Sequence, residues 1–541
     1  MRAEVRYVKR SCDAIARRTG LLLLAAALAA GCARTPQRGV MEAVAATPVV
    51  SAPVAAAAEA PGGPPKPAAF RDRGTEHLTE LGNAIGAIFD RPDFTGARWG
   101  VVVRSFDTGE TVYHRNETQT FAPASNEKLF TTTTALLLLG PDYKYATKFY
   151  TTGNLAGGGV LDGSLIVQGN GNFCIGPARP GEATAEQIAA LARQCKAAGI
   201  QQINGDIIGD DTWIDPQLKD WRSGSQVLNE NRITATLTDG GAPLLDPEGA
   251  PAKIINQVQH TDQAADPAPA DRRGGARLHA ARADSPDFSA DQSVFYLTGQ
   301  THAGETITAS GSFSGDRAVE LYLDVLKSAL EREGVKVSGG TRVLKAKDAE
   351  YAALMSGATM KFQSLSPPLS EILAWTNKPS DNYLAERLFL TDGFNLAGVA
   401  SPENGAKAVK QELAKFGIQP DNYKLVDGSG LSHSDAVRPA DIVTLLDAMR
   451  ETEHFPTFYA SLPIAGVDGT LRNRMKDTPA EGNVHAKTGH IRGVTALSGY
   501  ATSHDGERFT FSMIINENQG ASAVPDGAEN EVAALIAGFG R

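Results

Sequence analysis

Three short polar motifs, far apart in the chain, constrain the fold more than any other feature of this sequence. They are Ser125-Asn126-Glu127-Lys128, Ser380-Asp381-Asn382 and Lys487-Thr488-Gly489. Ser125 and Ser380 are 255 residues apart, and Ser380 and Lys487 are 107 apart. Each motif alone arises easily by chance in 541 residues, but their order, spacing and local settings argue against coincidence. A fold that uses all three must bring distant segments to one site.

The first motif predicts a serine activated by a neighbouring lysine. Apolar residues between Leu129 and Leu139 end at Gly140-Pro141, which is typical of a buried helix with a clear stop. On a helix, the i, i+3 spacing of Ser125 and Lys128 puts both side chains on one face, about 5 Å apart at Cβ. A lysine, whose pKa is ordinarily about 10.4, acts as a base only if burial or a nearby cation lowers that pKa. Lys487 is a candidate for this cation.

The second motif predicts a proton relay in a loop. Pro379 fixes the loop before Ser380, whose hydroxyl can pass a proton to a departing group. Asn382 can hold an amide of a ligand. Read alone, Ser380-Asp381 before a helical segment is also an ordinary helix cap, and Asp381 is open to that simpler interpretation.

The third motif predicts a strand along which a ligand docks. Gly489 has no side chain, so the backbone of a ligand can approach closely. The backbone N–H groups of Ser125 and His490 are then the natural oxyanion hole. With the serine and the lysine, these groups predict acyl transfer through a serine ester.

Charge and the N-terminal residues indicate an exported protein that does not bind nucleic acid. The net charge is −10, and no long basic run lies outside the leader, whereas phosphate binding needs clustered Lys and Arg. Basic residues precede the apolar run Leu21 to Ala30, which is too short to span a bilayer at roughly 20 residues and predicts a signal peptide. The junction at Gly31-Cys32 resembles a bacterial lipobox, in which Cys32 is lipidated. A plain secretory peptide cut nearby is the alternative.

Two further cysteines leave two interpretations open. Export permits a disulfide between Cys174 and Cys195. Cys195 also lies on the apolar stripe of a predicted helix, Ala185 to Ala198, so a buried free thiol is an equally good interpretation.

The pattern of elements predicts a multidomain α/β (α+β) protein. Apolar runs around turn residues predict β-hairpins at Trp99 to Tyr113 and at Val494 to Ile515, and a final helix covers Glu529 to Ala537. The predicted divisions are a signal peptide with lipobox (1–32), an Ala/Pro-rich tether (33–70), a first catalytic part (71–151), a mainly β inserted module of one or two subdomains (152–358) and a second catalytic part (359–541).

Two other kinds of catalytic site fit the sequence poorly. The segment Asp427 to Asp435 holds Ser, His and Asp close together, but a Ser-His-Asp triad usually gathers residues distant in sequence. We interpret this segment as a glycine turn. The ten histidines include no His-Glu-x-x-His, and none of their spacings suggests a zinc site. We therefore expect neither a metal nor a cofactor.

With its three motifs in this order, the chain resembles the serine D-Ala-D-Ala carboxypeptidase/endopeptidase family, the low-molecular-mass class C penicillin-binding proteins. A β-lactamase has only some tens of residues between its first two motifs, so the longer separation here matches the large insertion of this family. The resemblance runs from about residue 75 to the end and includes Asn377 to Asn382 and Asp427 to Leu431. It implies a β-lactamase/transpeptidase-like antiparallel sheet with flanking helices, interrupted by the inserted module.

The resemblance also implies a role for each motif residue. Ser125 would be the acylated nucleophile, Lys128 its general base and Ser380 the proton relay. Asn382 would position the substrate. The pair Lys487-Thr488 would bind the terminal carboxylate.

Four further positions are candidate binding residues. Gly489 and His490 complete the substrate-binding strand, although threonine is common where His490 stands. Asp211, in the insertion, is a candidate for meeting the free amine of a diaminopimelate side chain. Arg492 either helps to bind a carboxylate or is a solvated surface arginine.

We therefore predict a periplasmic, membrane-anchored serine DD-peptidase. Its expected partners are peptidoglycan stem peptides, peptidoglycan cross-links and β-lactam antibiotics, and it would act as a carboxypeptidase, an endopeptidase or both. The alternatives are a β-lactamase or esterase with the same nucleophile, and a catalytically silent wall-binding lipoprotein.

Overall fold

The computed structural model describes residues 76–172, 185–218, 232–238, 242–246, 252–261, 277–280, 293–302, 306–312, 318–518 and 523–541. The predicted signal peptide, lipobox and tether lie outside these residues, and so does Cys174. Within the described ranges, none of the helices combines the length and the hydropathy that a bilayer span requires.

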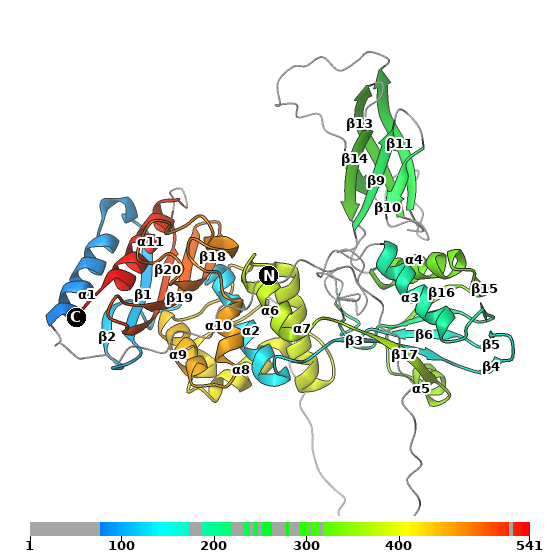
Figure 1. The fold of residues 1–541 in the computed structure, drawn as a ribbon, viewed down its shortest axis with the longest axis horizontal. Helices are drawn as coiled ribbons and strands as arrows, with labels where there is room; N and C mark the ends of the chain where they lie inside the picture. The colour runs from blue at the N-terminus through cyan, green and yellow to red at the C-terminus, as the bar shows by residue number, and fades with distance from the viewer. Residues whose placement is uncertain are drawn as a thin grey trace, which may run out of the picture. The chain divides into compact units, whose positions relative to one another are not determined.

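The three motifs belong to a part of the chain built on a five-stranded antiparallel sheet, ordered β18-β19-β20-β1-β2 (Figure 1). β1 pairs with both β2 and β20, so the N-terminal hairpin joins the C-terminal one, and both predicted hairpins are confirmed. The strands are β1 Arg98–Ser105, β2 Thr111–Arg115, β18 His485–Ile491, β19 Val494–Thr502 and β20 Arg508–Asn516.

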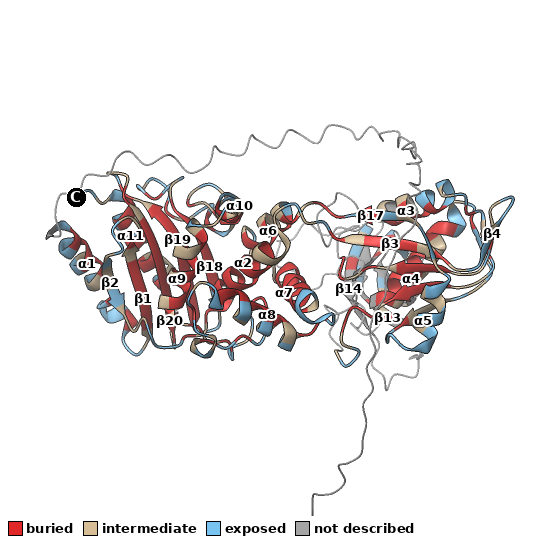
Figure 2. Cartoon of the chain, turned by 90° about the horizontal axis from the view of Figure 1, so that it is seen from below, coloured by how far each residue is buried: buried red, intermediate tan, exposed pale blue. Residues whose placement is uncertain are grey.

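Helices cover both faces of this sheet, which is why β19 and β20 are buried along almost their whole length (Figure 2). On one face, α1 (Glu76–Phe89) and α11 (Ala523–Gly538) share a core with Val101 and Leu497. On the other face, Ala496 and Ile514 join a core made with the remaining helices. These are α2 Glu127–Leu139, α6 Leu369–Asn377, α7 Asn382–Ala397, α8 Pro402–Ala414, α9 Pro439–Arg450 and α10 Phe455–Ser461.

Helix α2 is the central helix of that second core. Its residues from Glu127 to Leu136 are all buried, and it ends at Gly140, whose φ of 77° is a conformation that glycine adopts without strain. The predicted buried helix and its stop are confirmed. Ser125 lies just before α2, in the short turn Ala124–Asn126.

The residues between β3 and β17 form a separate set of sheets with its own core. β3 (Ala146–Thr151) and β17 (Thr359–Leu365) pair antiparallel in a sheet ordered β16-β8-β6-β3-β17. Three smaller sheets are ordered β15-β7-β5-β4, β10-β9-β14 and β11-β13-β12. Their strands are β4 Asn154–Ala156, β5 Val160–Asp162, β6 Leu165–Gln168, β7 Gln202–Ile203, β8 Ile207–Asp210, β9 Arg232–Thr238, β10 Leu244–Asp246, β11 Ala252–Thr261, β12 Arg277–Ala280, β13 Ser293–His302, β14 Thr306–Ser312, β15 Lys336–Val337 and β16 Thr341–Leu344.

Among the described residues of this region, three helices accompany these strands: α3 Ala185–Ala197, α4 Ala318–Arg332 and α5 Ala349–Ser356. Cys195 lies on α3 within the core, and burial raises the pKa of its thiol to about 12. Cys195 is a free, buried cysteine, which agrees with the interpretation of a buried free thiol on the apolar stripe. Helices and sheets together confirm the predicted mixed α/β class.

Candidate active site

The Ser125 hydroxyl and the Lys128 amine are in hydrogen-bond contact. Lys128 Nζ lies 2.8 Å from Ser125 Oγ, 2.6 Å from Asn382 Oδ1 and 2.7 Å from the Ser429 carbonyl oxygen. These partners come from the turn before α2, the N-terminus of α7 and the loop after α8, so the fold brings Lys128 together with groups that are about 250 to 300 residues away. Lys128 itself is fully buried.

The three contacts fix the direction in which Lys128 can accept a proton. A neutral amine has two N–H groups and one lone pair, whereas an ammonium has three N–H groups and no lone pair. The Asn382 and Ser429 oxygens can only accept hydrogen bonds in this arrangement, so they take the two N–H groups. The lone pair of the neutral amine is therefore left for the hydroxyl hydrogen of Ser125.

Burial also gives Lys128 a pKa suited to that task. Desolvation lowers the pKa of its amine to about 8, although the carboxylates of Glu386, Asp427 and Asp381 act in the opposite direction. The sequence left open whether burial or Lys487 would lower this pKa, and burial is the main cause. Lys128 instead acts on Lys487, whose pKa is lowered well below its ordinary value by burial and by the charge of Lys128.

The glycine turn that follows α8 contributes directly to the site. The Asp427 carboxylate accepts the N–H groups of Ser429, Gly430 and Ser432, and this shapes the loop that points the Ser429 carbonyl at Lys128. The Glu386 carboxylate accepts the Ser429 hydroxyl at 2.6 Å. The segment is a turn, as predicted, but its contact with Lys128 was missed, because a backbone carbonyl leaves no signature in a sequence.

The second and third motifs meet through a serine–lysine contact of their own. Lys487 Nζ donates to Ser380 Oγ at 2.8 Å and to the Thr488 carbonyl at 2.9 Å. Ser380 has a φ of 62°, which is unfavourable for a residue with a side chain and holds its hydroxyl at the start of α7. Asp381 caps α7 by accepting the Leu384 N–H, in agreement with its simpler interpretation.

Strand β18 passes directly beside the nucleophile turn. Asn126 Nδ2 donates to the Lys487 carbonyl at 3.0 Å. A Cβ atom added at Gly489 would lie 2.8 Å from the Pro123 carbonyl oxygen and 3.1 Å from the Ser125 nitrogen. Only glycine permits this approach, which brings the N–H of Ser125 next to the strand that carries His490.

Other predicted positions lie away from this hydrogen-bond network. Asp211 follows β8, and its N–H donates to the Leu344 carbonyl in the neighbouring strand. Arg492 is exposed in the turn after β18. His490 Nε2 lies 2.8 Å from Asp526 Oδ1, so its side chain turns towards α11.

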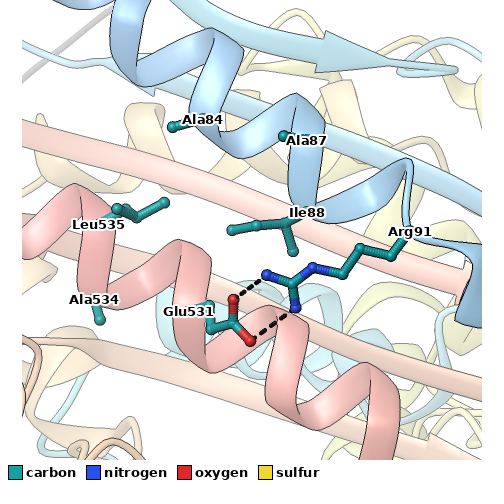
Figure 3. Close-up of a pocket in the computed structure, with 7 residues that line it drawn as sticks. All are labelled: Ala84, Ala87, Ile88, Arg91, Glu531, Ala534 and Leu535. Carbon is teal, nitrogen blue, oxygen red and sulfur yellow. Dashed lines mark hydrogen bonds and ion pairs between the residues drawn. The ribbon is translucent and has the colours of Figure 1, made fainter.

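A groove between α1 and α11 holds none of the motif residues (Figure 3). Figure 3 shows Ala84, Ile88 and Leu535 along its walls, with Arg91 and Glu531 closing one end through a two-point ion pair. None of the described residues that line this groove carries a nucleophile of the kind predicted at Ser125.

The fold and these contacts define a serine acyl-transfer enzyme with a penicillin-binding-protein type of sheet. The chain belongs to the D-Ala-D-Ala carboxypeptidase 3 (S13) family, whose pattern matches residues 81–537. The family predicted from the motifs is confirmed, and the protein is a serine-type DD-peptidase.

Individual relatives agree with this assignment. The chain is 31% identical over 491 residues to a D-alanyl-D-alanine carboxypeptidase of Actinomadura sp. (strain R39), with 87% of each chain covered. It is 26% identical over 440 residues to the D-alanyl-D-alanine carboxypeptidase DacB of Haemophilus influenzae, covering 78% of this chain and 86% of that one. The structure of penicillin binding protein 4 from Haemophilus influenzae, complexed with a β-lactam, matches with a TM-score of 0.65 and 25% identity, covering 84% of this chain and 99% of that one.

Proposed function

We propose that the chain hydrolyses D-alanyl bonds of peptidoglycan through an acyl-enzyme on Ser125. The observation that carries the proposal is the 2.8 Å contact between Lys128 Nζ and Ser125 Oγ, with the two N–H groups of the neutral amine directed elsewhere. In the first step, Ser125 Oγ attacks the D-alanyl carbonyl while its proton passes to Lys128. The N–H groups of Ser125 and His490 stabilise the oxyanion, a contribution typically worth about 10²- to 10³-fold in rate per donor.

In the second half of acylation the amide bond breaks. Ser380 gives a proton to the leaving amine and is itself held by Lys487, which explains why a fully buried lysine contacts that hydroxyl. The proton that Lys128 took from Ser125 replaces the one that Ser380 gave up, which returns Lys128 to its neutral form. Water then attacks the ester, Lys128 accepts a proton from that water, and this proton returns to Ser125 Oγ as the ester bond breaks.

Substrate binding is assigned to the strand and to the start of α7. Asn382 positions the peptide, Gly489 and His490 pair with its backbone, and Lys487 with Thr488 bind the terminal carboxylate. Thr488 is preorganised for this role by a hydrogen bond between its hydroxyl and that of Thr470, 2.7 Å long.

Two assignments extend the proposal to larger substrates. Asp211 meets the free amine of a diaminopimelate side chain, because a carboxylate is the natural partner of an ammonium group. Cross-links are then cleaved at the same serine as stem peptides, since both contain a D-alanyl amide.

β-Lactams are proposed to acylate Ser125 because their amide mimics the D-alanyl amide. The Haemophilus influenzae relative is recorded with a β-lactam bound, which supports this assignment. Acyl-enzyme persists if deacylation is slow, and a β-lactamase would instead release the drug rapidly.

We also propose that the protein works in the periplasm, held to a membrane by a lipid on Cys32. Metabolic labelling with a fatty-acid analogue should mark the parent protein and not Cys32→Ser. Equal labelling of both proteins, or of neither, would refute the proposed lipid anchor on Cys32. The proposal for catalysis at Ser125 does not depend on this result.

The decisive experiment is intact-protein mass spectrometry after exposure to a penicillin. The parent should gain the mass of one drug molecule, and Ser125→Ala should gain none. Ser432→Ala is the matched control, because Ser432 lies beside His433 in the glycine turn and the adduct should persist without its hydroxyl. Rapid drug loss without an adduct would favour a β-lactamase, and intact drug without an adduct would favour a silent wall-binding protein.

A further inference from the structure

A cavity of about 500 Å³ opens beside the third motif. Thr488 and His490 of β18 line one wall, and Pro379, from the loop before Ser380, lines another. Arg472 and Arg474 come from the loop before β18, and Asp526 from α11. The cavity therefore shares Thr488 with the proposed carboxylate site and adjoins the loop that carries Ser380, the proposed proton donor.

Among the described residues that line this cavity, the charges leave one cation in excess. Arg474 is engaged by the carboxylates of Asp526 and Glu529 and by Asn530. Asp526 is also bound by His490. The Arg472 guanidinium is exposed, and it has no hydrogen bond or ion pair with any residue in the described part of the chain.

The cavity is larger than a single small amino acid requires. D-Alanine has six non-hydrogen atoms, which need roughly 180 Å³ at the roughly 30 Å³ that one water molecule occupies in the liquid. The remaining space holds roughly ten more atoms at that density, and the total lies within the range of about 300 to 1,000 Å³ usual for small-molecule sites.

We propose that this cavity is the subsite for an extended leaving group, and that Arg472 binds a second carboxylate on that group, beyond the one held at Thr488. The inference rests on the proposed function, which places the leaving amine between Ser380 and Thr488. The leaving group is an amine whose α-carbon bears one carboxylate and whose side chain ends in a second carboxylate, as in a cross-link through a diamino dicarboxylic acid. A guanidinium is suited to this task because it can bind both oxygens of a carboxylate at once.

Acyl transfer to added amines tests the subsite directly. A thioester of a D-alanyl peptide acylates Ser125, and an acceptor amine then attacks the ester carbonyl. The bond to Oγ breaks, and the amine proton returns to Ser125 Oγ. The acceptor occupies the leaving-group subsite in this reverse step, so its preference reports the cavity.

The two acceptors to compare are D-2-aminoadipate and its side-chain amide, which differ in one charge and almost nothing in size. The parent should transfer to the acid about five-fold faster than to the amide, and the preference should fall as salt is added. Arg472→Gln should abolish the preference. Arg492→Gln is the matched control, since this exposed arginine lies outside the cavity and its loss should leave the preference intact.

Three results would overturn the proposal. It is refuted if the parent shows no preference for the acid, if Arg472→Gln keeps that preference, or if Arg492→Gln loses it as well. Penicillin labelling of each variant establishes that Ser125 still reacts, so loss of preference is not loss of fold. If the parent is acylated neither by the thioester nor by penicillin, the proposed function itself fails, a result different from all three.

Discussion

The rate of Ser125 acylation should rise with pH through about 8, because only the neutral amine of Lys128 can accept the serine proton. Its pKa is lowered by burial to about 8. At pH 7 about a tenth of the enzyme then holds a neutral lysine, and at pH 9 about nine-tenths, so acylation should increase about ten-fold across this interval. A solvated lysine with a pKa of about 10.4 would be protonated throughout it.

The variant Asp381→Asn tests the electrostatic contribution to the Lys128 pKa, because it removes one negative charge. The Asp381 carboxylate raises the pKa of Lys128, so removing it should move the pH profile to lower pH and raise the rate at pH 7. A lower pKa leaves a larger neutral fraction of Lys128 at pH 7. Asparagine also caps helices, so the hydrogen bond to the Leu384 N–H is retained.

The assay is the second-order rate constant for acylation by a fluorescent penicillin, measured at constant ionic strength between pH 6 and pH 10. This constant reports ionisations of the free enzyme. Thermal unfolding at each pH controls for loss of fold. A flat profile, or one with an apparent pKa near 10, would refute the role of burial, and a profile of Asp381→Asn displaced to higher pH would refute the electrostatic argument.

Two glycine substitutions test the packing around the nucleophile. Gly489→Ala puts a Cβ atom 3.1 Å from the Ser125 nitrogen and should lower penicillin acylation by about 10²-fold, the cost of losing one oxyanion donor, with little change in melting temperature; normal acylation would show that the strand can shift. Gly430→Ala puts a Cβ atom within 1.8 Å of the Ala124 carbonyl at a φ of 79° and should reduce both acylation and melting temperature. Gly96→Ala is its control, with a φ of 85° and open space, and should cost only about 1–2 kcal/mol of backbone strain; equal effects of the two would contradict the steric argument.

Local patterns in the sequence predicted the elements that carry the chemistry. The helix after Ser125 was predicted with its stop at Gly140, because burial and glycine act over a few residues. Both hairpins were predicted for the same reason, since strand alternation and turn residues are local. The final helix was also found, although it begins at Ala523, earlier than expected.

Features that depend on distant contacts were not predicted. Nothing near Ser429 in the sequence indicates that its carbonyl accepts a hydrogen bond from Lys128, 301 residues away. Arg472 was not singled out, because its value comes from a cavity formed with α11 and the loop at Pro379. The strained φ of Ser380 is likewise visible only in the folded chain.

The sequence by itself determined the reaction class, the family and the main elements of the catalytic sheet, because three motifs in this order are characteristic of that family. Only the tertiary structure decided which way the Lys128 lone pair points and that burial and not Lys487 lowers its pKa. It also decided that Arg472, beside Thr488, has no charged partner among the described residues. Hydrogen-bond direction, desolvation and charge balance all depend on atoms brought together from distant parts of the chain, and no local pattern encodes those distances.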